Sequence, residues 1–320
     1  MGKEILYDEI PSLDLNDFKN GDPAAKQQFV DSLGTAYNNI GFVAIKNHGL
    51  SDDLTTKLYG SVQSFFRQND EVKTSYEVPG IFGQRGYVSK GKEKAKGRNT
   101  GDLKEFYHVG QPDDAQKIYP DNVWPQEVSG FREHTLEAYQ TLEQAGVYML
   151  RAIALYLGLE ETYFDDKVKS GNSILRAIHY FPIENPEEIP DDAVRAAEHG
   201  DINLITLLMG ASADGLQVKR KDGKWIPITA LPDQIVVNVG DMMSRLTNNK
   251  LKSTIHRVVN PPKDKMKTSR FSIPFFMHPI SEMDLTCLES CIDEENPKLY
   301  KDVTAGEFLQ ERLSEIGLKK

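Results

Sequence analysis

Cysteine is nearly absent from this 320-residue sequence, which contains only Cys287 and Cys291. Two thiols are too few for a disulfide framework or a four-thiolate zinc site, and their scarcity is typical of a reducing compartment. Long apolar runs are also missing, since no stretch approaches the about 18 consecutive apolar residues of a membrane span. The N-terminal MGKEILYDEIP lacks the apolar segment of a signal peptide. We therefore expect a cytoplasmic protein with no membrane partner.

Basic residues are outnumbered by acidic ones, 38 to 48, so the net charge is −10. Nucleic-acid binding needs a clustered cationic surface, which this balance argues against. The basic residues that do cluster lie in one segment: Lys90, Lys92, Lys94, Lys96 and Arg98. This segment fits either a solvated loop or a lid that attracts an anionic substrate. We expect a small-molecule partner, with a monomer as the default oligomeric state.

The first half of the chain has the periodicity of mixed helix and strand. Apolar residues at helical spacing predict helices after Asp22 and Ser51, both suitable N-caps, and a long amphipathic helix over 128–158. FVAIKNHG at 42–49 predicts a short strand that ends in a turn. Residues 79–101 lack periodicity and are rich in Gly, Lys and Arg, which indicates a long loop.

Short β-like runs follow one another after Gly171 and are separated by turn signals. They are SILRAIHYF, INLITLLM, LQVKR, KWIPI, QIVVNVG, TIHRVV and RFSIPFF. Such spacing predicts an all-β sandwich or barrel, and Thr304 and Glu307 form a capping box for a C-terminal helix. We expect one compact unit: an N-terminal mixed region (1–125), a supporting helix (126–170), a β-core (171–290) and a C-terminal tail (291–320).

A histidine and an aspartate stand two residues apart ahead of an apolar run, at His199 and Asp201. In an extended segment residues i and i+2 point to the same side. A mononuclear iron site uses two histidines and one carboxylate on one face and leaves three positions open. His256, inside the apolar run STIHRVVN, is the candidate third ligand. The alternative for His256 is a hydrogen-bonded core histidine.

Arg270 and Ser272 also share one face of a predicted strand. The planar guanidinium matches a carboxylate, and the serine hydroxyl can support the same anion. An arginine in a strand can instead protect a sheet edge. Together with the two histidines and Asp201, the pair indicates an iron site beside an anion-binding pocket.

The order of motifs resembles the isopenicillin-N-synthase-like family of Fe(II)-dependent oxygenases, most of which use 2-oxoglutarate. The resemblance rests on HGDINLITLL (199–208), DGLQV (214–218), GKWIPI (223–228), VVNVGD (236–241), KSTIHRVVNP (252–261) and RFSIPFF (270–276). GFVAIKNHG (41–49) and TAGEFL (304–309) extend it towards both ends of the chain. It implies a double-stranded β-helix (jelly roll), flanked by N-terminal and C-terminal helices.

The resemblance implies His199, Asp201 and His256 as the catalytic iron ligands. It implies Arg270, Ser272 and Tyr180 as partners of 2-oxoglutarate, although Ile178 stands where the family has an asparagine in LRAIHYFP (175–182). The implied reaction uses O₂ to convert 2-oxoglutarate to succinate and CO₂ while a C–H bond of the substrate is oxidised. Candidate substrates are amino acids and natural-product intermediates.

The substrate wall is expected at Tyr87, Arg98, Phe106, Ile178 and Phe276, judged from where the family has its pocket. The sequence does not distinguish hydroxylation from desaturation or cyclisation. Two alternatives stay open at this point: an Fe(II) oxidase that uses no 2-oxoglutarate and binds its own substrate's carboxylate, and a non-catalytic binding barrel. Other histidines are expected in structural roles, His48 in a turn and His179 in packing, whereas His278 has no predicted partner.

Overall fold

The computed structural model describes residues 5–93, 102–112, 118–185, 187, 194–209, 215–228, 231, 233–316 and 318. Its helices are α1 (Leu15–Lys19), α2 (Pro23–Asn39), α3 (Asp52–Phe66), α4 (Asp70–Thr74), α5 (Phe131–Tyr156), α6 (Asp165–Val168), α7 (Asp241–Leu246) and α8 (Ala305–Glu315). Within these residues, no helix is both long enough and apolar enough to cross a membrane.

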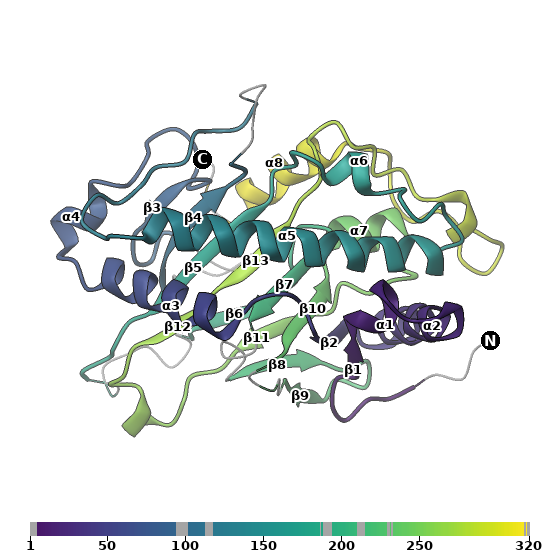
Figure 1. Ribbon diagram of the computed structural model, residues 1–320, viewed down its shortest axis with the longest axis horizontal. Coiled ribbons are helices and arrows are strands. Elements are labelled where there is room, and N and C mark those ends of the chain that lie inside the picture. The colour runs from purple at the N-terminus through teal and green to yellow at the C-terminus, as the bar shows by residue number, and fades with distance from the viewer. Residues whose placement is uncertain are drawn as a thin grey trace.

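The predicted helix starts are confirmed by their caps. The side chains of Asp22 and Ser51 accept backbone hydrogen bonds at the starts of α2 and α3, and Thr304 forms a reciprocal capping box with Glu307 at α8. The long predicted helix is α5, which begins three residues later and ends two residues earlier than the periodicity suggests. It lies across the large sheet and contacts strands β5, β7 and β13 (Figure 1).

Two sheets form the β-core. The larger contains β1 (Ser12–Asp14), β2 (Phe42–Lys46), β10 (Ile235–Val239), β7 (Ile205–Met209), β13 (Pro274–Met277), β5 (Ile174–Tyr180), β4 (Glu105–Gly110) and β3 (Gly86–Val88) in that order, with β12 (Arg270–Ser272) also paired to β5. The smaller contains β6 (Ala196–His199), β11 (His256–Val258), β8 (Leu216–Lys219) and β9 (Trp225–Pro227). Apart from the β1–β2 pair, neighbouring strands are antiparallel.

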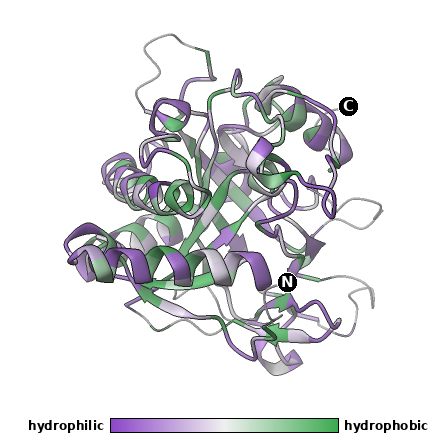
Figure 2. Cartoon of the chain, turned by 90° about the vertical axis from the view of Figure 1, so that its right-hand side faces the viewer, coloured by the Kyte–Doolittle hydropathy of each residue, from purple (hydrophilic) through white to green (hydrophobic). Residues whose placement is uncertain are grey.

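The large sheet has one face towards the helices and one towards a cavity. Alternation along β13 sends Phe275 and Met277 into the core cluster that contains α2, α3 and α5, whereas Pro274 and Phe276 line the cavity. The small sheet contributes residues to the same cavity from the opposite side. In Figure 2 the central strands are largely hydrophobic, and the helices around them carry hydrophilic stretches. The jelly-roll core flanked by helices is therefore confirmed.

Strands that the sequence pattern did not indicate are β1, β3, β4 and β6. β3 lies inside the segment that was predicted as a loop over 79–101, where it pairs with β4. β6 consists of Ala196, Ala197, Glu198 and His199, residues of low β-propensity. Its strand conformation comes from pairing with β11, which a local pattern does not reveal.

A buried ionic cluster ties β4 to the helical layer. Glu105 is 1% exposed and accepts hydrogen bonds from Lys73 (2.9 Å), the Tyr87 hydroxyl and His179 Nδ1 (2.7 Å). Burial raises the pKa of Glu105, but the hydrogen bonds from His179, Tyr87 and Lys73 outweigh it and lower the pKa to about 2. The carboxylate is therefore charged throughout the neutral range.

We expect Glu105→Gln to lower the free energy of unfolding by about 3 kcal/mol, because it removes the buried carboxylate partner of the buried Lys73 and leaves only the exposed Asp70. Urea denaturation measures this loss. Asp53→Asn, in an exposed ion pair with Lys57, is the control and should change stability by less than about 1 kcal/mol. Since the folded pKa of Glu105 is depressed, its contribution is present at neutral pH and is lost as the pH falls from about 4 towards 2. Equal losses for both variants would contradict the role of this cluster.

Candidate metal centre and its cavity

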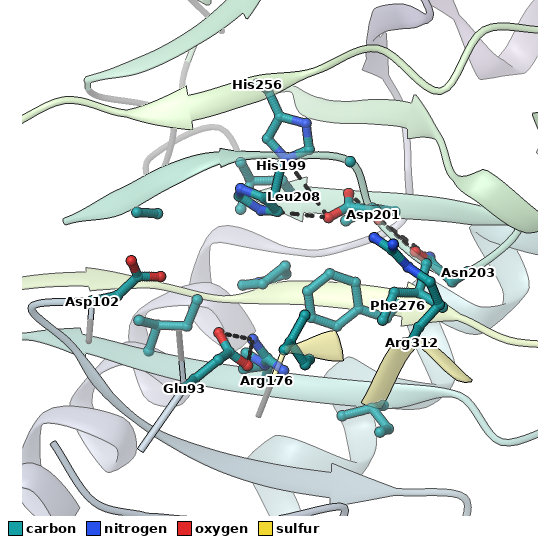
Figure 3. A pocket seen from close by; sticks show the side chains of 18 of the residues that line it. Glu93, Asp102, Arg176, His199, Asp201, Asn203, Leu208, His256, Phe276 and Arg312 are labelled. Carbon is teal, nitrogen blue, oxygen red and sulfur yellow. Dashed lines mark hydrogen bonds and ion pairs between the residues drawn. The ribbon is translucent and has the colours of Figure 1, made fainter. Parts of the chain in front are cut away.

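A cavity of about 500 Å³ lies between the two sheets. Its wall includes strand residues from both sheets and side chains of α8, among them Phe42, Ile174, Ile178, Tyr180, Leu208, Ser272, Pro274, Phe276, Leu309, Arg312 and Leu313. The volume suits a small molecule together with a cosubstrate. His199, Asp201 and His256 also line it and lie together at one side (Figure 3).

The small sheet brings the predicted iron ligands together. His256 begins β11 and is the antiparallel partner of His199, which ends β6, so that their rings lie 4.4 Å apart. Asp201 follows β6 after one intervening residue. The potential ligand atoms of the three residues all lie within 4.8 Å of one another. Strand pairing therefore brings His256 to a histidine and an aspartate that lie 57 and 55 residues before it in the sequence.

Hydrogen bonds turn the two imidazoles towards Asp201. His199 Nδ1 lies 2.7 Å from the Ala197 carbonyl, and His256 Nδ1 lies 3.1 Å from that of Thr254. Both Nδ1 atoms therefore carry the proton. The Nε2 atoms lie 3.9 and 3.6 Å from Asp201 Oδ1, beyond hydrogen-bond distance. Their lone pairs are available to a cation, and the donor set of two imidazoles and one carboxylate is that of a non-haem Fe(II) site.

Asp201 is held through its other oxygen. Oδ2 accepts hydrogen bonds from Thr206 Oγ1 at 2.7 Å and from Asn238 Nδ2 at 2.8 Å, which leaves Oδ1 facing the histidines. Burial raises the pKa of Asp201, but the two imidazoles and these hydrogen bonds outweigh it and lower the pKa. Desolvation, together with the neighbouring His256, lowers the pKa of His199 to about 4. At neutral pH this aspartate is charged and His199 is neutral, the protonation states that metal binding requires.

The predicted anion-binding residues lie on the large sheet. Arg270 and Ser272 of β12 pair with Tyr180 and Ile178 of β5. The Arg270 guanidinium lies over the Tyr180 ring, 4.8 Å from its centroid. Ser272 and Tyr180 are buried and line the cavity. A cation, a hydroxyl and a phenol thus gather at this part of the sheet, as binding of a carboxylate requires.

Only some of the residues expected in the substrate wall line the cavity. Ile178 and Phe276 line the cavity. Tyr87 does not, because it shares the helix-side face with Tyr107 and hydrogen-bonds to Glu105. Phe106 lies behind the wall, covered by the Arg176 guanidinium at 4.3 Å. Arg98 lies outside the described residues.

The basic segment is described only in part, since Lys94, Lys96 and Arg98 lie outside the described residues. Lys92 forms an ion pair with Glu77, and Lys90 lies over the ring of Phe181. Of the remaining histidines, His48 contacts the Asp233 carbonyl at 3.2 Å and His179 stacks on Phe271, as expected of structural residues. Cys287 and Cys291 are both buried and unpaired.

A charged network opposite the metal centre was not predicted. Glu93 pairs with Lys104 (2.7 Å) and Arg176 (3.1 Å), and Lys104 also pairs with Asp102 (2.9 Å). Figure 3 shows Glu93 and Arg176 across the cavity from His256, with Phe276 between them. Alternation along β5 places Arg176 on the face of Ile178 and Tyr180, so the strand pattern contained this signal. Glu93, Asp102 and Lys104 lie in no strand or helix, so no periodic pattern of the sequence indicated them.

Arg312 of α8 is a second unpredicted wall residue. It pairs with Asp241 at 3.5 Å, and Leu309 and Leu313 line the cavity from the same helix. The amphipathic pattern of α8 predicted a buried face but not which surface that face covers.

Two family models match the chain. Residues 10–127 match the non-haem dioxygenase in morphine synthesis N-terminal family, and residues 171–279 match the 2OG-Fe(II) oxygenase superfamily. Proline hydroxylase buaE of Petromyces alliaceus is 32% identical over 95% of this chain and 98% of its own length.

Solved structures agree. A 2OG-Fe(II) oxygenase family protein from Caulobacter crescentus has a TM-score of 0.84 and 42% identity, over 96% of this chain and 99% of that one. A full-length Neurospora crassa protein, solved in complex with alpha-KG and thymine, has a TM-score of 0.85 and 30% identity, over 95% and 96%. These similarities span nearly the whole length of each protein. The chain belongs to the family of Fe(II)- and 2-oxoglutarate-dependent oxygenases.

Proposed function

We propose that this enzyme hydroxylates a C–H bond of a small molecule held in the cavity, while 2-oxoglutarate is converted to succinate and CO₂. The observation that carries the proposal is the convergence of His199, Asp201 and His256 on one side of the cavity. These three residues would hold Fe(II) through two Nε2 atoms and Asp201 Oδ1. When bound, the metal and its cosubstrate supply O₂ activation and the oxidation of the substrate.

The chain itself binds, orients and excludes water. Arg270, Ser272 and Tyr180 would bind the distal carboxylate of 2-oxoglutarate, which fixes the direction in which the cosubstrate enters. Thr206 and Asn238 keep Asp201 oriented, and the backbone carbonyls of Ala197 and Thr254 keep both imidazoles in the tautomer that binds a metal. Apolar residues such as Ile178 and Phe276 limit the water around the reacting C–H bond.

The test is succinate formation by Fe(II)-loaded enzyme with 2-oxoglutarate and O₂ over a panel of small molecules. Proline and thymine belong in it because a relative is a proline hydroxylase and a structural neighbour was solved with thymine. We expect slow succinate formation without substrate, acceleration by one class of compound, and a product heavier by one oxygen atom. Acceleration with a product that has lost two hydrogens instead would replace hydroxylation by desaturation or cyclisation.

The hydrogen bond from Asn238 to Asp201 should be required for tight metal binding. Asn238→Leu removes this donor while keeping a similar volume, so Asp201 loses one of the two contacts to Oδ2. We expect about 10- to 100-fold weaker Fe(II) binding, the usual effect of losing such a partner. Anaerobic metal titration measures it, with the thermal midpoint of the metal-free protein as the folding control. Unchanged affinity in a stably folded variant would contradict this positioning role.

We further propose that residues 171–290 form the oxygenase core, supported by 1–125, 126–170 and 291–320 within one compact unit. A cytoplasmic monomer without nucleic-acid or membrane partners fits the two buried, unpaired cysteines and the net charge of −10. Light scattering coupled to size exclusion tests the oligomeric state, and a dimer mass would overturn that part.

A further inference from the structure

One stripe of side chains runs along the cavity face of β12 and β13. It starts at Arg270 and continues through Ser272, Pro274 and Phe276 to His278, and its members from Ser272 onwards line the cavity. His278 lies six positions after Ser272, which is a span of roughly 20 Å in an extended chain at about 3.3 Å per residue. His278 therefore lies towards the end of the cavity that is remote from the 2-oxoglutarate residues.

His278 is a buried polar side chain with an unused nitrogen. It is 7% exposed, and its Nδ1 has no hydrogen-bond partner among the described residues. Burial lowers the pKa of His278 to about 4, so the ring is neutral at physiological pH. A buried polar atom without a partner costs about 1–3 kcal/mol. In a cavity wall, a hydrogen bond to a ligand accounts for such an atom.

Amide side chains form the wall beside His278, and the buried Arg85 lies behind them, where its guanidinium donates to Asn172 Oδ1 at 3.4 Å. Asn172 and Gln84 line the same part of the wall, and Asn172 Nδ2 donates to Gln84 Oε1 at 3.3 Å. Ser173, next to Asn172, bonds the backbone of His278 and fixes its position (3.1 and 3.3 Å). Two amides and one neutral imidazole offer donors and acceptors without charge.

The charged side chains of the described wall are already matched. Lys104 and Arg176 share Glu93, and Arg312 lies beside Asp241. A substrate carboxylate at the remote end would have to compete with these pairs or stay uncompensated in a buried site. The charge balance thus favours a neutral substrate there.

We propose that His278, with Asn172 and Gln84 beside it, recognises the uncharged carbonyl and N–H edge of a cyclic amide or imide. His278 is then a specificity-determining residue, and Phe276, two residues earlier in the same stripe, supplies an apolar surface of the cavity (Figure 3). The inference rests on the proposed function, because it assumes that 2-oxoglutarate occupies the Arg270 end.

Matched pairs of compounds test it. Uracil and orotate share one ring with and without a carboxylate, as do 2-pyrrolidinone and pyroglutamate. Binding is measured by calorimetry on protein loaded with Mn(II) and 2-oxoglutarate without O₂, so that no turnover occurs. We expect at least one neutral member to bind at least about tenfold more tightly than its carboxylated counterpart, because burial of an unpaired charge is disfavoured.

Two variants assign the effect to His278. His278→Phe keeps an aromatic ring at this position but removes the imidazole nitrogens. It should weaken binding of the neutral compound at least about tenfold, as loss of a buried hydrogen bond predicts. His278→Asn places an amide oxygen near the position of Nδ1 and should restore much of the affinity. Both should bind Mn(II) and 2-oxoglutarate like the wild type.

The inference is overturned if the carboxylated compounds bind more tightly, if His278→Phe leaves affinity unchanged, or if loaded wild-type protein binds neither neutral compound. The titrations also measure the binding of Mn(II) and of 2-oxoglutarate to the wild type, before any test compound is added. If either fails to bind, the proposed function is overturned, and the inference with it.

Discussion

Replacing Asp201 with alanine should abolish Fe(II) binding and reduce succinate formation to background. Asp201 is the only carboxylate in the described cluster and lies within 4 Å of both Nε2 atoms, so its removal leaves two imidazoles and no anionic ligand. Loss of an outer hydrogen-bonding partner already costs about 10- to 100-fold in metal affinity, and loss of the ligand itself should exceed that. Anaerobic Fe(II) titration and a succinate assay measure the two effects.

The control for Asp201→Ala is Asp222→Asn, a substitution in the exposed β8–β9 turn. Asp222 pairs with Arg220 and has no contact with the cluster, so this variant should bind Fe(II) as the wild type does. The folded state of Asp201→Ala is checked by its thermal midpoint. Stoichiometric and tight Fe(II) binding by Asp201→Ala would show that the metal is held elsewhere.

Replacing Arg270 with alanine should raise the KM for 2-oxoglutarate by about 30- to 150-fold, the equivalent of roughly 2–3 kcal/mol for a lost charge-assisted pair. The guanidinium is fixed over Tyr180 and stands beside the buried Ser272 hydroxyl, whereas the guanidinium of Arg195 lies farther from the centre of the Tyr180 ring, at 5.5 Å against 4.8 Å. Fe(II) affinity should stay unchanged, because the proposed ligands His199 and His256 lie on the other sheet. Initial rates against 2-oxoglutarate concentration measure the KM.

Arg257→Ala is the matched control for Arg270→Ala. Arg257 follows His256 directly, but its side chain stacks on Trp225 at 3.9 Å and bonds Gln217 at 2.9 Å, outside the described cavity wall. Its removal should change the KM for 2-oxoglutarate by less than about twofold, since a partly exposed cation outside the cavity wall acts weakly at a distance. If both arginine variants raise the KM equally, a general loss of positive charge explains the effect better than a specific pocket.

Much of the core was predictable because its strands have strong local signals. Each β-like run after Gly171 forms a strand, and INLITLLM and QIVVNVG become the neighbouring strands β7 and β10. β6 was not predicted, because the pairing of its Ala-rich sequence with β11 depends on contacts far along the chain. The same pairing places His256 opposite His199, a register that neither segment specifies alone.

The site was predictable where a residue and its neighbour share a strand face. Arg270 and Ser272 pair with β5 as alternation suggests, and Ile178 and Phe276 line the cavity. Tyr87 was wrongly expected on the wall, since its face depends on how β3 pairs with β4. Arg312 was missed because only tertiary packing decides which surface a C-terminal helix covers.

The most direct test of the iron and 2-oxoglutarate site is the amount of succinate formed per O₂ consumed by the Fe(II)-loaded enzyme with its best substrate. We expect the wild type to form one succinate for each O₂ consumed. Asp201→Ala should neither form succinate nor consume O₂, and Arg270→Ala should do neither at low 2-oxoglutarate. O₂ consumption and substrate oxidation without any succinate would contradict this. Arg270 and Ser272 would then bind the carboxylate of the substrate itself, and the chain would be an oxidase that uses no 2-oxoglutarate.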